Sequence, residues 1–156
     1  MTQKSETGKL GEDLACEYLV NNKYKVIERN FRRPWGELDI IAKDSRGVLV
    51  FVEVKTMKKY DNSANNAAIA EYDESFKNNP AILRYARHKI GYRDLSQILP
   101  EENLTAAKLK KLKRTAELYA NTNPNLVDDN KGYRIDLLAI TINDNNHSLK
   151  HFENIN

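Results

Sequence analysis

The chain has 156 residues, of which 40% are hydrophobic and 30% charged, so it is long enough for one domain with a single core and too apolar for full disorder. Its net charge of +3 is too small to indicate a polyanionic partner by itself. The single cysteine, Cys16, cannot form an internal disulfide, and no apolar run approaches the roughly 20 residues that span a bilayer. The polar start MTQKSETGKLGED lacks the apolar core of a signal peptide. These features predict a cytoplasmic protein with no membrane partner.

The first predicted element is a helix over residues 7–22, TGKLGEDLACEYLVNN. At about 100° per residue its apolar side chains share one face, and Glu12 lies at the edge of that face. A first strand is predicted over residues 24–31, where apolar and polar residues alternate well enough for a β-strand. The following RRPWG predicts a bend, because Pro34 cannot donate to a β-ladder and Gly36 is conformationally permissive.

Two further strands are predicted at 38–43 and 48–55, separated by a turn. A three-residue loop that ends in a left-handed Gly47 is a common hairpin closure. This loop would pair Asp44 with Val48, and that pair sets the register of the whole hairpin.

This register brings charged residues together inside an apolar hairpin. Counting back from the turn, Asp39 lands opposite Glu53, and directly opposed residues point to the same face with Cβ atoms roughly 5 Å apart. A two-residue loop would place the two carboxylates on opposite faces. Alternation adds Lys55 to the face of Glu53, together with Leu49 and Phe51. A lone E-x-K is most often a solvated strand face, but a face that is apolar at one end indicates partial burial. A buried carboxylate needs a partner or a cation.

The second half of the chain contains one strongly predicted helix and two strands. Residues 57–103 are predicted to be an insertion, with short helices in NAAIAEYDESF and PAILRYARHKIGYRD. A helix with Thr105 as its N-cap is predicted over 104–122. Strands are predicted at 133–143 and 148–155. The order of elements predicts an α/β fold in which helices flank a mixed sheet.

The two carboxylates and the nearby ammonium suit the hydrolysis of a phosphodiester bond. Asp39 and Glu53 would repel one another when both are ionised, and a divalent cation between them would remove that cost. Mg²⁺ typically uses one or two carboxylates and keeps several waters. Lys55 could hold a phosphate oxygen or lower the pKa of an attacking water. A metal, its carboxylates and an ammonium are the parts that such hydrolysis needs.

Seven blocks of the sequence also resemble a known family. GELDIIAKD and VLVFVEVKT resemble the catalytic core of the PD-(D/E)XK, or restriction-endonuclease-like, nucleases, and more closely the YraN family of predicted endonucleases. GKLGEDLACEYL, VIERNFR, KLKKLKRTAELY, YRIDLLAI and HFENI resemble further blocks of that family, in the same order. The resemblance covers residues 7–56 and 104–155. It implies a single restriction-endonuclease-like domain over residues 1–156, with a helical insertion after the third strand.

The resemblance also implies roles for individual residues. Asp39 and Glu53 are expected to bind Mg²⁺ or Mn²⁺, and Lys55 to be the catalytic lysine. Glu12 is similar to a helix glutamate that some of these nucleases add to the catalytic and metal site. The backbone carbonyl of Val54 is a further expected ligand. Two features depart from the family pattern, because Leu38 stands where the nominal motif has proline and the insertion is longer than the resemblance predicts.

Basic residues of the helix at 104–122 form a candidate nucleic-acid surface, since Lys and Arg neutralise phosphate charge. Those assigned to this surface are Lys108, Lys111 and Arg114. The other interpretation is a solvated helix face. The expected partner is DNA, including branched or single-stranded forms, with RNA left open. A homodimer is one expectation, because nucleases of this architecture often pair.

Two other functions remain open: a non-catalytic nucleic-acid-binding protein on a nuclease fold, and a module that only scaffolds other proteins. The remaining candidate residues favour structural roles. Trp35 is expected to pack under the bend rather than stack on a base, and Cys16 to be a small helix residue. Arg134 and Asp136 share a strand face and are expected to be structural. The histidines are too scattered for a zinc site; they are His88, His147 and His151.

Overall fold

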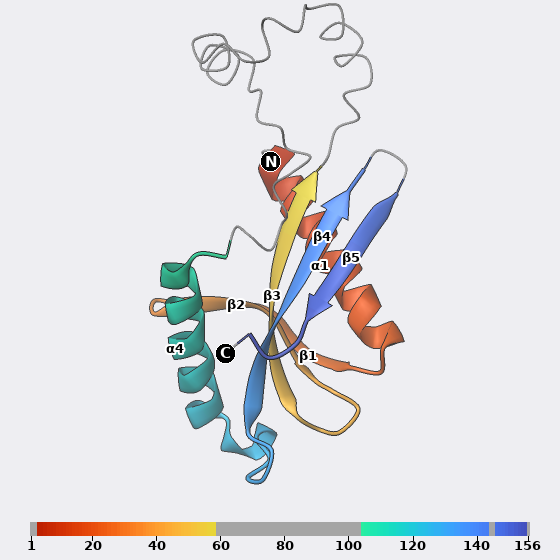
Figure 1. Cartoon of the computed structure of the whole chain (residues 1–156). Coiled ribbons are helices and arrows are strands. Elements are labelled where there is room, and N and C mark those ends of the chain that lie inside the picture. Colours follow the sequence, from red (N-terminus) through yellow and green to blue (C-terminus); the bar gives the residue numbers. More distant parts are fainter. Residues whose placement is uncertain (1–2, 59–103, 144–145, 156) are drawn as a thin grey trace, which may run out of the picture.

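The computed structural model describes residues 3–58, 104–143 and 146–155 (Figure 1). In this part of the chain a five-stranded sheet with the order β1-β2-β3-β4-β5 carries helix α1 on one face and helix α4 on the other. The helices are α1 (Gln3–Asn21), α4 (Ala106–Thr122) and the short 3₁₀ helix η3 (Pro124–Leu126). The strands are β1 (Lys25–Arg33), β2 (Gly36–Lys43), β3 (Leu49–Lys58), β4 (Tyr133–Ile142) and β5 (His147–Phe152).

These elements confirm the predicted mixed α/β architecture, which is consistent with a restriction-endonuclease-like fold. Strands β3 and β4 are parallel, whereas the other neighbouring pairs are antiparallel. The predicted third strand is longer than expected, because its pairing with β4 continues as far as Lys58 opposite Ile142. The two short helices predicted within 57–103 fall at residues 59–103, outside the described residues. No helix among the described residues is long and apolar enough to cross a membrane.

The turn between β2 and β3 is the predicted one. The Asp44 amide donates to the Val48 carbonyl and the Gly47 amide donates to the Asp44 carbonyl, each at 3.0 Å. Gly47 has a φ of 84°, in the left-handed region that glycine adopts without steric cost. The ladder then runs back from this turn to Ile40 opposite Val52. The register that the turn was expected to set is therefore confirmed.

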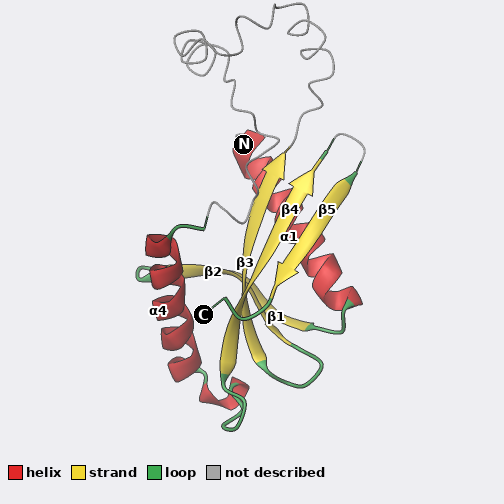
Figure 2. Cartoon of the chain, viewed as in Figure 1, coloured by secondary structure: helices red, strands yellow, loops and turns green. Residues whose placement is uncertain are grey.

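Figure 2 shows α1 and α4 on opposite faces of the sheet. An apolar cluster on each face holds the helix there. The buried residues of the α4-side cluster are Phe31, Leu38, Ile41, Leu49, Phe51, Leu112, Ala116, Tyr119, Ala120 and Ile135. Those of the α1-side cluster are Ala15, Leu19, Ile40, Val50, Val52, Leu138, Ile140 and Ile142. The alternation predicted along β3 is confirmed, because its odd-numbered apolar residues face α4 and its even-numbered ones face α1. Trp35 packs against the α4-side cluster, as expected.

A buried polar network on β4 ties the hairpin turn to the rest of the sheet. Arg134 donates from Nη1 to Asp44 Oδ2 at 2.7 Å, and from Nη2 to the Tyr24 hydroxyl at 2.7 Å. Its Nε donates to Asp136 Oδ1 at 3.0 Å, and His151 Nε2 lies 2.9 Å from Asp136 Oδ2. Because Asp44, Arg134 and Asp136 are buried and partnered with one another, the network agrees with the structural role expected for Arg134 and Asp136.

This network lowers the pKa of the Asp44 carboxyl. Burial alone would raise the pKa of its carboxyl, but hydrogen bonds from the Val48 amide, Arg134 and Arg46 lower the pKa from 3.8 to about 2. A carboxyl whose pKa is lower in the folded than in the unfolded chain contributes stability above its unfolded value. That stability is lost as the pH falls from 3.8 towards 2.

We therefore expect Asp44→Asn, which keeps the size and removes the charge, to destabilise the protein by about 2 kcal/mol at pH 7. The difference from wild type should shrink between pH 4 and pH 2, because protonated Asp44 also lacks the charge. Urea denaturation of both proteins at several pH values measures this. A difference that stayed constant down to pH 2 would contradict the assignment.

Candidate active site

The sheet opens where β2 leaves β3, and we call this opening the fork. The β2–β3 ladder ends at Ile40 opposite Val52, so the next pair in register is Asp39 and Glu53. Beyond this point β2 crosses behind β3 towards α4 (Figure 2). Asp39 Oδ2 accepts a hydrogen bond of 2.8 Å from the Val54 amide, a contact that β2 would otherwise make with its main chain. The carboxylate of Asp39 is thereby held against β3 beside Glu53.

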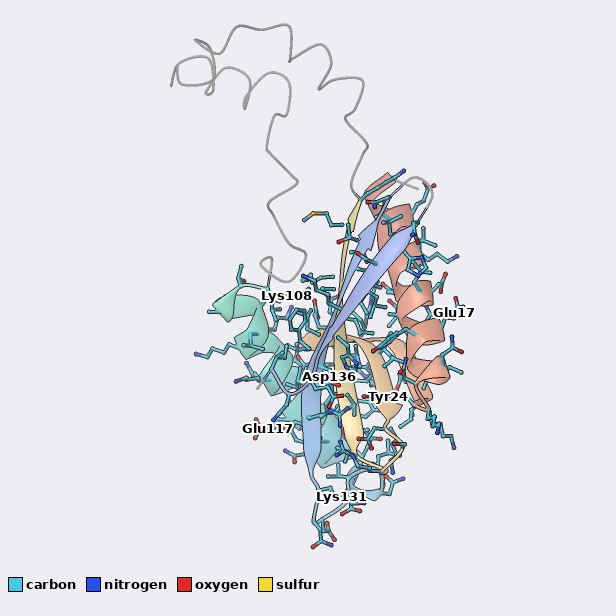
Figure 3. The ribbon with its side chains drawn as sticks, turned by 45° about the vertical axis from the view of Figure 1, so that its right-hand side comes forward. Glu17, Tyr24, Lys108, Glu117, Lys131 and Asp136 are labelled. Carbon is cyan, nitrogen blue, oxygen red and sulfur yellow. The ribbon has the colours of Figure 1, made fainter. Side chains whose placement is uncertain are left out.

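Glu53 is a buried carboxylate that two lysines neutralise. It is 2% exposed. Lys55 Nζ lies 2.7 Å from Glu53 Oε1, and Lys108 Nζ lies 2.6 Å from the same oxygen. Lys108 comes from the first turn of α4, on the side that faces the sheet (Figure 3). Thr105 caps this turn as predicted, since its side chain accepts a hydrogen bond from the Lys108 amide at 3.2 Å. The helix start is thus held by its cap while the Lys108 side chain reaches Glu53.

A hollow of about 370 Å³ opens between the fork and α4. Its lining residues are Glu37, Glu53, Ala107, Lys108, Lys111 and Leu112. Of the three basic residues assigned to nucleic acid, Lys108 and Lys111 therefore lie at this hollow. Arg114 is exposed on α4 and is not among the lining residues. The structure thus brings part of the predicted basic surface to the carboxylates.

Asp39 carries a charge that its surroundings do not fully compensate. Burial, and then the negative charge of Glu53, raise the pKa of Asp39 from 3.8 to about 6. The Val54 amide and Lys108 act in the opposite direction. Burial would lower the pKa of Lys108, but its hydrogen bond to Glu53 and the charges of both carboxylates raise it. The site therefore combines one neutralised carboxylate with one that favours an additional positive charge.

The donor set fits a hard divalent cation. Among the described residues, no three His, Cys, Asp or Glu side chains gather closely enough to hold a metal ion by themselves. Two neighbouring carboxylates nevertheless match the way Mg²⁺ is bound, because that ion keeps water and takes substrate phosphate as further ligands. The under-compensated charge of Asp39 beside Glu53 would favour a cation at this position.

Glu12 lies on α1, and its side chain contacts residues of β1. Its Oε2 accepts a hydrogen bond of 2.8 Å from Asn30 Nδ2 and lies 4.0 Å from Arg29 Nη2. The charge of Glu12 contributes to the raised pKa of Asp39, so the two groups are within electrostatic reach. Glu12 lines a separate hollow of about 610 Å³. Its role as a metal ligand, like that of the Val54 carbonyl, stays a prediction.

Two features of the site were missed by reasoning from the sequence. Lys108 was assigned to nucleic acid, whereas its ammonium contacts Glu53; no local pattern signals this contact, because it spans 55 residues of chain. Asn30 was not singled out at all. An asparagine inside a predicted strand was the available signal, because asparagine tolerates left-handed backbone better than most other non-glycine residues.

The comparisons with known proteins all lead to one family. A sequence profile of the uncharacterised protein family UPF0102 matches residues 11–78. A UPF0102 protein of Syntrophotalea carbinolica is 34% identical over 106 residues, which are 68% of this chain and 81% of the relative. A UPF0102 protein of Persephonella marina is 33% identical over 139 residues, which are 89% of this chain and 84% of the relative.

Other relatives match a shorter part of the chain at a higher sequence identity. A UPF0102 protein of Trichlorobacter lovleyi is 55% identical over 51 residues, which cover 33% of this chain and 40% of the relative. The UPF0102 protein CE1920 of Corynebacterium efficiens is 49% identical over 57 residues, 36% of this chain and 47% of the relative. The chain thus matches less than half the length of these two relatives.

The names of these relatives state membership of a family and no activity. The two longer alignments each cover more than two thirds of both proteins at over 30% identity. The chain therefore belongs to the uncharacterised protein family UPF0102, the YraN family.

Proposed function

We propose that this protein is a metal-dependent nuclease that hydrolyses phosphodiester bonds in DNA. The observation that supports this most directly is the position of Asp39 beside Glu53 at the fork, with Lys55 on the Glu53 carboxylate. Two acids and an ammonium, gathered beside an open hollow that Glu53 lines, form an arrangement suited to phosphate chemistry. A purely structural role would not require the uncompensated charge of Asp39.

Asp39, Glu53 and the carbonyl of Val54 would hold the cation. A bound Mg²⁺ or Mn²⁺ supplies a Lewis acid that polarises the phosphate and acidifies water. The ion pair with Glu53 holds the Lys55 ammonium beside that carboxylate, where it would orient a water or a phosphate oxygen. Lys55 and Lys108, which both contact Glu53, would supply the ammonium groups for the phosphate of a substrate.

Helix α4 is the proposed contact with the DNA backbone. Lys108 and Lys111 lie at the hollow, and Arg114 is exposed further along the helix. Charges on this helix would neutralise successive phosphates and hold the scissile bond over the fork. Branched or single-stranded DNA and pairing of two copies are compatible with this proposal.

A second candidate is a nucleic-acid-binding protein that does not cleave. One observation favours it: Lys55 and Lys108 both contact Glu53 Oε1, so this carboxylate is already neutralised by the protein itself. In that case the basic surface of α4 would bind nucleic acid and the carboxylates would only anchor the lysines.

Asp39→Asn, Glu53→Gln and Lys55→Ala are each expected to lower Mg²⁺- or Mn²⁺-dependent DNA cleavage by about a hundredfold or more. Cleavage of labelled duplex, flap, junction and single-stranded DNA by the purified protein measures this. Lys113→Ala is the matched control, because this lysine is exposed on α4 and is not among the residues lining the hollow. Cleavage that survives all three substitutions would refute the mechanism, whereas wild-type protein that binds DNA without cutting it would favour the second candidate.

The ionised carboxylate of Asp39 is also expected to lower the stability of the folded protein. Its pKa is higher in the folded protein, about 6, than the ordinary value of 3.8. The neutral carboxyl is therefore tolerated below pH 3.8, and stability is lost as the pH rises through 6. Above that pH the folded protein carries the full cost of the ionised group.

Asp39→Asn is thus expected to raise the stability at pH 7 by on the order of 2 kcal/mol, and to change it little at pH 4. Mg²⁺ should raise the Tm of wild type at pH 7 and have little effect on the variant. Thermal denaturation at both pH values, with and without Mg²⁺, tests this. Asp44→Asn is the control with the opposite sign, and an Asp39→Asn protein less stable than wild type at pH 7 would contradict the electrostatic picture.

A further inference from the structure

Strand β1 changes faces at Asn30. Arg29 Nη2 donates to Asp13 Oδ1 on α1 at 2.7 Å, whereas the Phe31 ring packs against Tyr119 of α4 with 5.0 Å between ring centroids. In a regular strand, residues two apart point to the same face. Asn30 lies between them with a φ of 53°, in the left-handed region. The left-handed residue therefore coincides with the reversal of the strand.

Strand β2 makes the same reversal directly opposite, at Asp39. Leu38 belongs to the α4-side cluster and Ile40 to the α1-side cluster, although they too are two residues apart. The pairs on either side in the β1–β2 ladder place Asn30 opposite Asp39. Both strands therefore turn over at one cross-strand pair, and that pair contains a carboxylate of the fork.

The side chain of Asn30 has a second task. Its Nδ2 donates to Glu12 Oε2 at 2.8 Å, and the Glu12 side chain is 22% exposed. Glycine would meet the backbone requirement at this position with no strain. What asparagine adds is the amide that holds Glu12 to the strand, at the position across from Asp39. A residue needed only for the bend would not require this amide.

We infer that Asn30 is a positioning residue for a divalent cation bound by Asp39 and Glu53. Its left-handed backbone turns the strand pair at Asp39. Its amide holds the Glu12 carboxylate on the α1 side of that pair. The inference rests on the proposed function, since the cation is part of that proposal. It assigns Asn30 no contact with substrate. Asn30 acts through Glu12, which would accept a hydrogen bond from one of the waters of the cation.

Asn30→Gly separates the two tasks, because glycine keeps the left-handed backbone and removes the amide. We expect the Tm of this variant to stay close to that of wild type. Its affinity for Mn²⁺ should fall by about tenfold or more, a typical loss when a hydrogen-bond partner around a metal site is removed. Mn²⁺ binding to the full chain without DNA is measured by electron paramagnetic resonance. In a Glu12→Ala background, Asn30→Gly should cause no further loss. Lys23→Gly is the matched control, because Lys23 is also left-handed, with a φ of 66°, and is exposed outside the site.

The outcomes separate this inference from the proposed function. If Asp39→Asn abolishes Mn²⁺ binding but Asn30→Gly binds as tightly as wild type, the inference is overturned and the nuclease proposal stands. An equal loss in the Glu12→Ala background would also overturn it, because Asn30 would not act through Glu12. Wild-type protein that binds no Mn²⁺ would bring down both. Asn30→Asp, which tolerates the same backbone but repels Glu12, should weaken Mn²⁺ binding as well and serves if the glycine variant does not fold.

Discussion

The register between β2 and β3 depends on Asp44, and the candidate site depends on that register. The main chain of Asp44 closes the turn, while its carboxylate accepts hydrogen bonds of 2.9 Å from the amides of Arg46 and Val48. Arg134 holds the same carboxylate from β4. A slip of one residue would turn Glu53 to the α1 face, away from Lys108, because side chains alternate along a strand. The hydrogen bonds and ion pair of Asp44 at the turn thus determine the face to which the carboxylates of the fork point.

The protein contains two acidic centres with opposite electrostatic character. Around Asp44, hydrogen bonds outweigh burial and the carboxylate is stabilised as an anion. Around Asp39, burial and the charge of Glu53 outweigh one amide and one lysine, so the anion is disfavoured. The surroundings of Asp44 stabilise the fold. The ionised Asp39 destabilises it, and a bound cation would offset that destabilisation. Strong perturbation by burial together with a like charge is typical of functional sites.

The fork is assembled from segments that are distant in sequence. The hairpin provides both acids and Lys55, while the start of α4 provides Lys108 on the other side of residues 59–103. On the far side of the strand pair, α1 is tied to β1 through Asn30 and Glu12. Helix α4 therefore contacts the fork through Lys108, whereas α1 contacts the neighbouring strand β1 through Glu12. The position of each helix is set by its own apolar cluster.

The sequence by itself determined the local features of the protein. Gly47 and the alternation of β3 predicted the turn, the two faces and the pairing of Asp39 with Glu53, because a hairpin register follows from loop length and a period of two. Thr105 predicted the start of α4 for an equally local reason, a side chain that caps its own helix. Only the tertiary structure decided that Lys108 contacts Glu53, that Glu12 is held by Asn30, and that Asn30 reverses its strand. These contacts depend on how α1 and α4 pack on a strongly twisted sheet, and packing between distant segments leaves no periodic pattern along the chain.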